Sequence, residues 1–172
     1  MNIHESPKGC IRTNSGLFIN VFEPNKDVIT IEDIAHALAS VPRFGGHLNR
    51  PYSVAQHSVM CMMRVKSLED KKAALMHDAS EAYLGDIPTP IKAKLPEYKT
   101  CEHNLMVMIA DKFGFEYPLN QTVKEVDALM LQIEWENLVL EDNPLFECWD
   151  HKTAKETFIK AFELLFVEAV VV

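Results

Sequence analysis

Residues 73–92 read Ala-Ala-Leu-Met-His77-Asp78-Ala-Ser-Glu81-Ala-Tyr-Leu-Gly-Asp86-Ile-Pro-Thr-Pro-Ile-Lys92. The alanines and aliphatic residues of this stretch predict a buried helix. An imidazole beside a carboxylate is costly to bury unless the two are paired or coordinate a metal ion. Because a helix turns about 100° per residue, His77 and Asp78 point into adjoining sectors, and Glu81 follows one turn later. The stretch therefore predicts two metal ligands and a proton-handling carboxylate around one point.

The composition limits the class of protein. The chain has 172 residues, enough for one domain over residues 1–172 that buries most of a sizeable core. Hydrophobic residues make up 48% and charged residues 24%, as in ordinary soluble globular proteins. The net charge of −8 argues against a surface that binds a nucleic acid polymer, which would carry a basic stripe. A small anionic substrate remains compatible, because Arg43, Lys92 and Lys94 can supply a local positive pocket.

The cysteines and the chain ends carry no extracellular or membrane signal. Four cysteines lie far apart, without a Cys-x-x-Cys pair: Cys10, Cys61, Cys101 and Cys148. They indicate free, mostly buried thiols in a reducing compartment rather than a zinc knuckle or a disulfide framework. No basic region followed by an apolar run opens the chain, and the apolar run near the C-terminus is too short to span a bilayer. We therefore expect a cytoplasmic protein that does not bind a membrane.

Periodicity predicts a mostly α-helical domain with a small N-terminal β-hairpin. Residues 10–23 predict the hairpin, because β-branched and aromatic residues flank a polar turn. Thr30 is expected to cap the first helix. The helical core is predicted over about residues 30–170, with helices from residue 30 and over about 53–65, 71–84, 96–113, 122–140 and 153–167. Gly85 is expected to end the helix over 71–84, and Pro88 and Pro90 to hold an extended turn after it.

Two further polar residues interrupt apolar helix faces, His57 and Asp127. Joined with His77 and Asp78, they give two imidazoles and two carboxylates from three helices. Such a mixed nitrogen and oxygen set suits Mn²⁺, Co²⁺, Fe²⁺, Zn²⁺ or Mg²⁺ and does not choose among them. Four protein ligands around a six-coordinate ion leave two positions for water and a substrate oxygen. This is the layout for metal-assisted hydrolysis, so we expect one divalent ion per chain.

Each of these residues also has a plainer interpretation when taken separately. His57 can be a hydrogen-bonded core histidine, and His77 with Asp78 an ordinary hydrogen-bonded pair. Asp127 can be a helix cap or a salt-bridge partner, and Glu81 a solvated helix residue. The metal interpretation depends on all of these positions together with the loop that follows residue 84.

The pattern His57, then His77-Asp78, then Asp127 resembles the H…HD…D pattern of the HD-domain phosphohydrolases. The resemblance is closest to the bacterial HD-domain 5′-deoxynucleotidases and to short phage-type HD phosphohydrolases. Residues 77–92 are similar to the central motif of these enzymes almost residue for residue. With Arg43-Phe44 and the segments around His57 and Asp127, the resemblance covers residues 40 to 135 and implies a single helical HD-type domain.

The resemblance implies a role for each site residue. The four ligands would hold the metal: His57, His77, Asp78 and Asp127. Glu81 would position or deprotonate the attacking water, and Asp86 would serve as a second acid or base, or as the partner of the leaving group. Arg43 would clamp the phosphate, for which its fork of donors is suited.

Three more residues are predicted to bind substrate. Phe44 stands where the nucleotidases usually have a tryptophan, so the aromatic face is kept and the indole N–H is lost. His47, after two glycines, is a candidate phosphate contact, although a surface histidine fits as well. Lys92 is a further candidate phosphate contact, with a solvated lysine as its alternative.

These features predict hydrolysis of a deoxynucleoside 5′-monophosphate to nucleoside and phosphate. A deoxynucleoside triphosphohydrolase is the alternative within the superfamily, because a neighbouring subunit can supply cations for the outer phosphates. A non-catalytic nucleotide-binding protein is the alternative of another class, but it would have no use for Glu81, Asp86 and Arg43. Alarmone hydrolysis fits less well, since Ala82 follows Glu81 where that branch has Asp. We expect a homo-oligomer in the cytoplasm, or in the host cytoplasm if the chain is phage-encoded.

Overall fold

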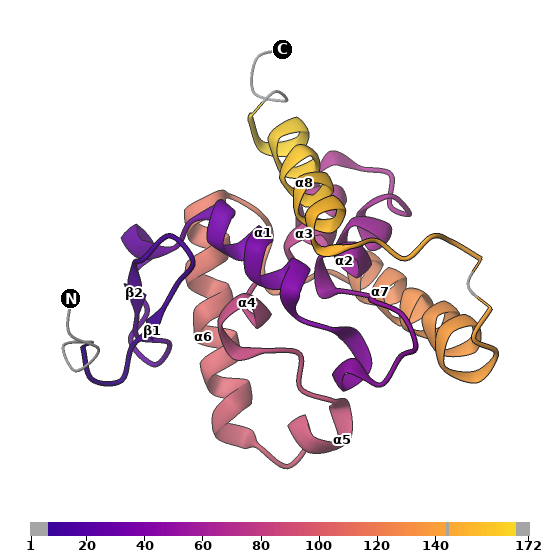
Figure 1. Cartoon of the computed structure of the whole chain (residues 1–172). Helices are drawn as coiled ribbons and strands as arrows, with labels where there is room; N and C mark the ends of the chain where they lie inside the picture. The colour runs from indigo at the N-terminus through magenta and orange to yellow at the C-terminus, as the bar shows by residue number, and fades with distance from the viewer. Residues whose placement is uncertain (1–6, 144, 168–172) are drawn as a thin grey trace.

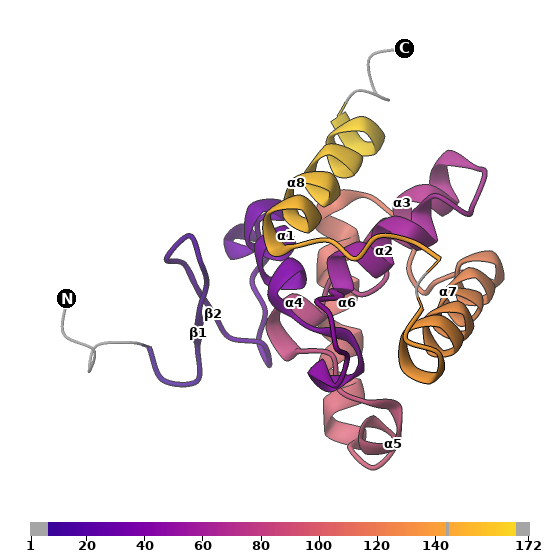
Figure 2. The ribbon, with the colours of Figure 1, turned by 45° about the vertical axis from the view of Figure 1, so that its right-hand side comes forward.

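Helices make up most of the structure and a short β-hairpin precedes them (Figure 1), which confirms the predicted fold class. The computed structural model describes residues 7–143 and 145–167. In the hairpin, β1 (Ile11–Arg12) pairs antiparallel with β2 (Phe18–Ile19), so that Ile11 lies opposite Ile19. Figure 2 shows the hairpin standing to one side of the helices.

The helical part follows in chain order. It comprises η2 (Lys26–Val28), α1 (Ile31–Ser40), η3 (Arg43–Gly46), α2 (Val54–Met62), α3 (Leu68–Met76), α4 (Glu81–Leu84), α5 (Thr89–Lys92), α6 (Pro96–Phe113), α7 (Gln121–Glu134), η4 (Trp135–Leu140), α8 (His151–Phe162) and η5 (Glu163–Val167). The stretches η4 and η5 are π-helical continuations of α7 and α8. None of the helices in the described part of the chain has both the length and the apolar character needed to cross a bilayer.

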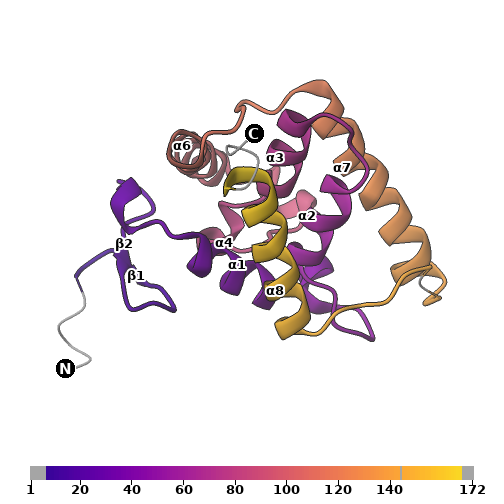
Figure 3. The ribbon, with the colours of Figure 1, turned by 90° about the horizontal axis from the view of Figure 1, so that it is seen from above.

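The core lies where α1, α2, α3 and α8 pack together, with α7 along its edge (Figure 3). Leu38 of α1, Leu75 of α3 and Phe158 of α8 are fully buried there. Alanines at the contacts, such as Ala73 and Ala154, let these helices approach closely. The apolar stripes predicted from the sequence thus form the shared core that fixes α2, α3 and α7 next to one another.

Polar caps set the starts of the helices that carry the site. Thr30 accepts a hydrogen bond from the backbone N–H of Asp33, which confirms the predicted cap of α1. The Ser53 hydroxyl does the same for α2, accepting from Gln56, and Asn120 does so for α7. Each cap satisfies one of the free N–H groups of a first helical turn.

The predicted continuous helix over residues 71–84 is wrong. The helix ends at Met76, and a tight turn through residues 77–80 leads into α4. Hydrogen bonds of the i to i+3 type close this turn, as from the N–H of Glu81 to the carbonyl of Asp78, and α4 ends at Gly85 as expected. The prediction failed because a tight helical turn and an α-helix share the same residue preferences.

The extended turn expected at Pro88 and Pro90 is half right. Pro88 is extended, but Pro90 lies in the first turn of α5. A proline is tolerated there because the N–H it lacks would have no partner inside the helix.

Candidate metal centre

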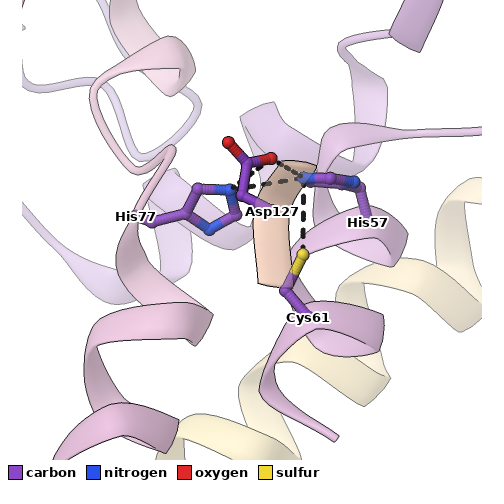
Figure 4. Close-up of side chains that lie close together, drawn as sticks. All are labelled: His57, Cys61, His77 and Asp127. Atoms are coloured by element: carbon purple, nitrogen blue, oxygen red, sulfur yellow. Dashed lines mark hydrogen bonds and ion pairs between the residues drawn. The ribbon is translucent and has the colours of Figure 1, made fainter. Parts of the chain in front are cut away.

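The structure brings the four predicted ligands together. His57 comes from α2, His77 and Asp78 from the tight turn after α3, and Asp127 from α7. Nε2 of His57 lies 3.3 Å from Nε2 of His77 and 3.1 Å from Oδ1 of Asp127. Dashed lines join these residues in Figure 4. Oδ2 of Asp78 lies 3.2 Å from Nε2 of His77 and 3.8 Å from Nε2 of His57. Atoms that bind one ion at about 2.1 Å stand about 3.0 to 3.5 Å apart, so this spacing fits a shared cation.

The hydrogen bonds of the two rings support the same conclusion. Nδ1 of His77 lies 2.8 Å from the carbonyl oxygen of Ala74, and Nδ1 of His57 lies 2.5 Å from a carboxylate oxygen of Glu134. Both partners only accept, so each Nδ1 carries a hydrogen and each ring turns its Nε2 inward. Two ring nitrogens and two carboxylate oxygens therefore converge at one point. The donor set fits a divalent cation, since fixed ring orientation of this kind is typical of metal-binding histidines.

The electrostatics of this cluster also demand positive charge. Burial lowers the pKa of the His57 ring and Arg43 lowers it further, but hydrogen bonds with Asp127 and its other neighbours raise it well above the usual value. For His77, burial again lowers the pKa, and the Asp78 and Asp127 carboxylates raise it well above normal. Either protons or a metal ion would neutralise these carboxylates.

Cys61 lies beside the predicted ligands. Its Sγ is 3.5 Å from Nε2 of His57, one turn earlier on α2 (Figure 4). Cys61 forms a group with His57, His77 and Asp127 whose donor atoms all lie within 4.8 Å of one another. The sequence predicted a free buried thiol, which the structure confirms, but its closeness to the site was missed. The spacing of four residues from His57 was the available signal.

A second residue that sequence reasoning missed is Glu134, at the end of α7. Its side chain is fully buried. One carboxylate oxygen accepts from Nδ1 of His57 at 2.5 Å and from the hydroxyl of Tyr52 at 2.7 Å. The other accepts from Nη2 of Arg43 at 3.0 Å. Burial raises the pKa of Glu134, but its bonds with His57 and the charge of Arg43 lower it overall, so the carboxylate stays ionised.

Glu134 stands seven residues after Asp127, on the same face of α7, and that spacing was the sequence signal available for predicting it.

The four predicted ligands, called the metal cluster below, adjoin a pocket of about 600 Å³ that Asp78 and Asp127 line. Its charged lining residues are Arg43, Asp78, Glu81, Asp86, Lys92 and Asp127. Carboxylates outnumber cations there by four to two. A phosphate would be repelled from such a lining unless a bound cation balanced it, which agrees with the donor set of the cluster.

Arg43 is held rigidly at the inner end of this pocket. Its backbone N–H donates to the carbonyl of Tyr52 at 2.9 Å, and its side chain is buried. Nη1 faces the carboxylates of Asp78 and Asp86 at 3.9 and 3.8 Å, and Nε is buried with no hydrogen-bond partner in the described residues. Burial disfavours the charge, but Glu134 and these carboxylates raise the pKa of Arg43, which keeps the guanidinium charged.

Glu81 and Lys92 also line this pocket. Oε1 of Glu81 lies 3.6 Å from Nζ of Lys92, whereas Oε2 is buried and has no hydrogen-bond partner in the described residues. Burial and the charges of Asp78 and Asp86 raise the pKa of Glu81 to about 9. Burial is also the main cause of the raised pKa of Asp86. Lys92 donates to Glu102 at 2.7 Å and is thus only partly available to a ligand.

The two remaining predicted residues differ in position. Phe44 lines the pocket, with its ring 5.7 Å from Cζ of Arg43. His47 is exposed and does not line the pocket, so the structure does not bring it to the other site residues.

The sequence is similar to several known bacterial proteins. The chain is 42% identical over 148 residues to YfdR, an uncharacterised protein of Escherichia coli, and the match covers 86% of this chain and 83% of YfdR. It is 31% identical over 112 residues to the 5′-deoxynucleotidase VV1113 of Vibrio vulnificus, covering 58% of this chain and 49% of that protein. It is 36% identical over 94 residues to the 5′-deoxynucleotidase VP0926 of Vibrio parahaemolyticus, covering 49% and 40%.

No protein-family model matches the sequence. The two Vibrio proteins are distant and matched in part, and they support the HD-type phosphohydrolase resemblance. The chain belongs to the protein family of YfdR.

Proposed function

We propose that this protein is a divalent-metal-dependent phosphohydrolase that releases phosphate from deoxynucleoside 5′-monophosphates. The observation that carries the proposal is the convergence of His57, His77, Asp78 and Asp127 at the inner end of a pocket that also contains Arg43. The names of the two distant Vibrio relatives support the substrate class.

The metal would be held by the two imidazoles and the two carboxylates. When bound, a divalent ion lowers the pKa of a water molecule and neutralises charge on a phosphoryl group. His57 and His77 are each fixed by a hydrogen bond from Nδ1, so the ligand positions are set before the ion arrives.

The phosphate would be gripped by Arg43. Its Nη2 donates to Glu134. Nη1 is 3.9 and 3.8 Å from the carboxylates of Asp78 and Asp86, and the buried Nε has no hydrogen-bond partner in the described residues. A charged donor left without a close partner in a buried site is free to bind an anion. Arg43 thus combines a fixed position with donors available to the substrate.

The two carboxyl groups that would not bind the metal supply proton transfer. Glu81 lines the pocket together with Asp78, and its Oε2 has no hydrogen-bond partner in the described residues; Glu81 would position the attacking water. Asp86 faces Nη1 of Arg43 at 3.8 Å and would serve the leaving oxygen of the nucleoside. Two additional carboxyl groups in the pocket favour an enzyme over a non-catalytic nucleotide-binding protein.

The cations of the pocket favour a monophosphate over a triphosphate. Among the lining residues only Arg43 and Lys92 are basic, and each already forms an ion pair. A triphosphohydrolase would need further cations for the outer phosphates, which these lining residues do not supply.

A phosphate-release screen tests the proposal. The metal-loaded protein would be incubated with the four deoxynucleoside monophosphates, their ribose counterparts and the triphosphates, each with Mn²⁺, Co²⁺, Mg²⁺ or Zn²⁺. We expect inorganic phosphate from the deoxynucleoside monophosphates. Tripolyphosphate from the triphosphates would replace the proposal by the triphosphohydrolase alternative. Nucleotide binding without any product would replace it by a non-catalytic role.

A further inference from the structure

The outer end of the pocket is apolar and continues the helix face that carries Asp127. Leu131 and Trp135 follow Asp127 at intervals of four residues, and all three line the pocket. The backbone N–H of Trp135 donates to the carbonyl of Leu131, so the helical spacing is kept where α7 passes into η4. Eight residues of helix extend about 12 Å, so Trp135 lies well beyond the metal cluster along the pocket.

Trp135 is paired with a second aromatic ring, that of Phe44 in η3. The centroids of Phe44 and Trp135 are 6.2 Å apart, and the two planes meet at 49°. Phe44 adopts a left-handed backbone conformation, with φ of 54°, which is uncommon for a bulky residue. Strain of this kind persists where the surroundings hold a side chain in a functional position. In this conformation the Phe44 residue lines the pocket next to Arg43.

Trp135 is also unusually available. The residue remains 48% exposed although it lines a pocket. The apolar lining also includes Ile87 and Pro88, before α5, and Pro90 in its first turn. The pocket therefore has a charged inner end and an apolar, aromatic outer end. This suits a molecule with an anion at one end and a flat apolar ring at the other.

We propose that Trp135, assisted by Phe44, forms a stacking subsite for the nucleobase of the substrate. This inference rests on the proposed function, since it assumes that the phosphate of the same nucleotide lies at the metal cluster. Stacking uses the face of the base and not its edge, so Trp135 should strengthen nucleotide binding whichever base is present. The sugar would lie between, against Phe44 and Leu131.

The binding test compares two ligands and two variants, all in a Glu81→Gln background that slows turnover. Calorimetry would measure the dissociation constants of deoxyadenosine 5′-monophosphate and of deoxyribose 5-phosphate, which lacks the base. Trp135→Ala should weaken the nucleotide by about 10- to 100-fold and leave the sugar phosphate unchanged. The matched control is Leu129→Ala, on the same helix and 49% exposed but outside the pocket lining, which should change neither constant. Equal nucleotide affinity in Trp135→Ala would overturn the proposal.

A second measurement separates this inference from the proposed function. The chain has two tryptophans, so Trp149→Phe leaves Trp135 as the fluorescent reporter. Deoxyadenosine and thymidine, which carry no phosphate, should quench its fluorescence saturably, and inorganic phosphate should not. Quenching without any hydrolysis would refute the proposed phosphohydrolase activity and support the base subsite. Hydrolysis without quenching, with Trp135→Ala at full affinity, would refute the subsite and keep the enzyme.

Discussion

Nδ1 of His57 lies 2.5 Å from a carboxylate oxygen of Glu134, whose other oxygen binds Arg43 at 3.0 Å. One buried carboxylate therefore positions a predicted metal ligand and the predicted phosphate clamp together. Glu134 thus links the predicted metal ligand His57 to the predicted phosphate-binding residue Arg43, although it would itself touch neither metal nor substrate. Glu134 is accordingly a positioning residue.

Glu134→Gln should lower metal affinity by about 10- to 100-fold, because the amide no longer supplies the charge that orients His57. It should also raise KM, because Arg43 loses its charged partner. Calorimetric titration with Mn²⁺ and steady-state kinetics would measure the two effects. Glu125→Gln, exposed on the same helix, is the control and should change neither. An unchanged metal affinity and KM in Glu134→Gln would remove the positioning role.

Asp78 and Cys61 compete for a place among the ligands, since both lie within 4 Å of Nε2 of His57. With the set proposed above, Asp78→Asn should lose bound metal, while Cys61→Ser should retain it. Elemental analysis of the two purified variants decides between them. Co²⁺ substitution adds a spectroscopic check, because a thiolate ligand would give a sulfur-to-cobalt charge-transfer band that we do not expect. The opposite result would replace Asp78 by Cys61.

Glu81→Gln should leave the metal content intact and reduce kcat by about 10²-fold or more, the usual scale for a positioned acid or base. Parallel metal analysis and phosphate-release kinetics would show this separation. Loss of metal together with activity would make Glu81 a ligand instead. Full activity would remove it from the mechanism.

Arg43→Lys should reduce kcat/KM by about 10- to 100-fold with metal content preserved, because an ammonium cannot copy the two-pronged grip of a guanidinium. Arg43→Ala should lose more, and it should also destabilise the fold by about 3–5 kcal/mol, because it leaves Glu134 without its buried partner. Thermal melts would separate the two causes. Arg50→Lys, which pairs with Asp142 outside this pocket, is the control. Unimpaired hydrolysis in Arg43→Ala would place the phosphate elsewhere.

Much of the fold could be predicted because its signals are local. The stripe of apolar residues and the capping residue Thr30 define α1, and α6 runs over Pro96–Phe113 as the periodicity indicated. The break after Met76 could not be predicted, because its turn is closed by i to i+3 hydrogen bonds that leave no distinct sequence pattern. That turn matters for the site, since it sets His77 and Asp78 side by side.

The site was predicted only as far as its residues break an apolar pattern. His57 and Asp127 do so, and the structure brings them together with His77. Glu134 and Trp135 were missed because a polar residue followed by an aromatic one looks like an ordinary helix surface. Their positions depend on how α7 packs against α2 and on the loop that carries Phe44, which are tertiary facts.

The most direct measurement is the rate of phosphate release from deoxynucleoside 5′-monophosphates by chelator-treated protein, before and after one equivalent of Mn²⁺ or Co²⁺ per chain. We expect no release before addition and release afterwards, with Asp78→Asn inactive under both conditions. Release at the same rate in the presence of chelator, or none with any divalent ion, would contradict a metal-dependent phosphohydrolase at this site.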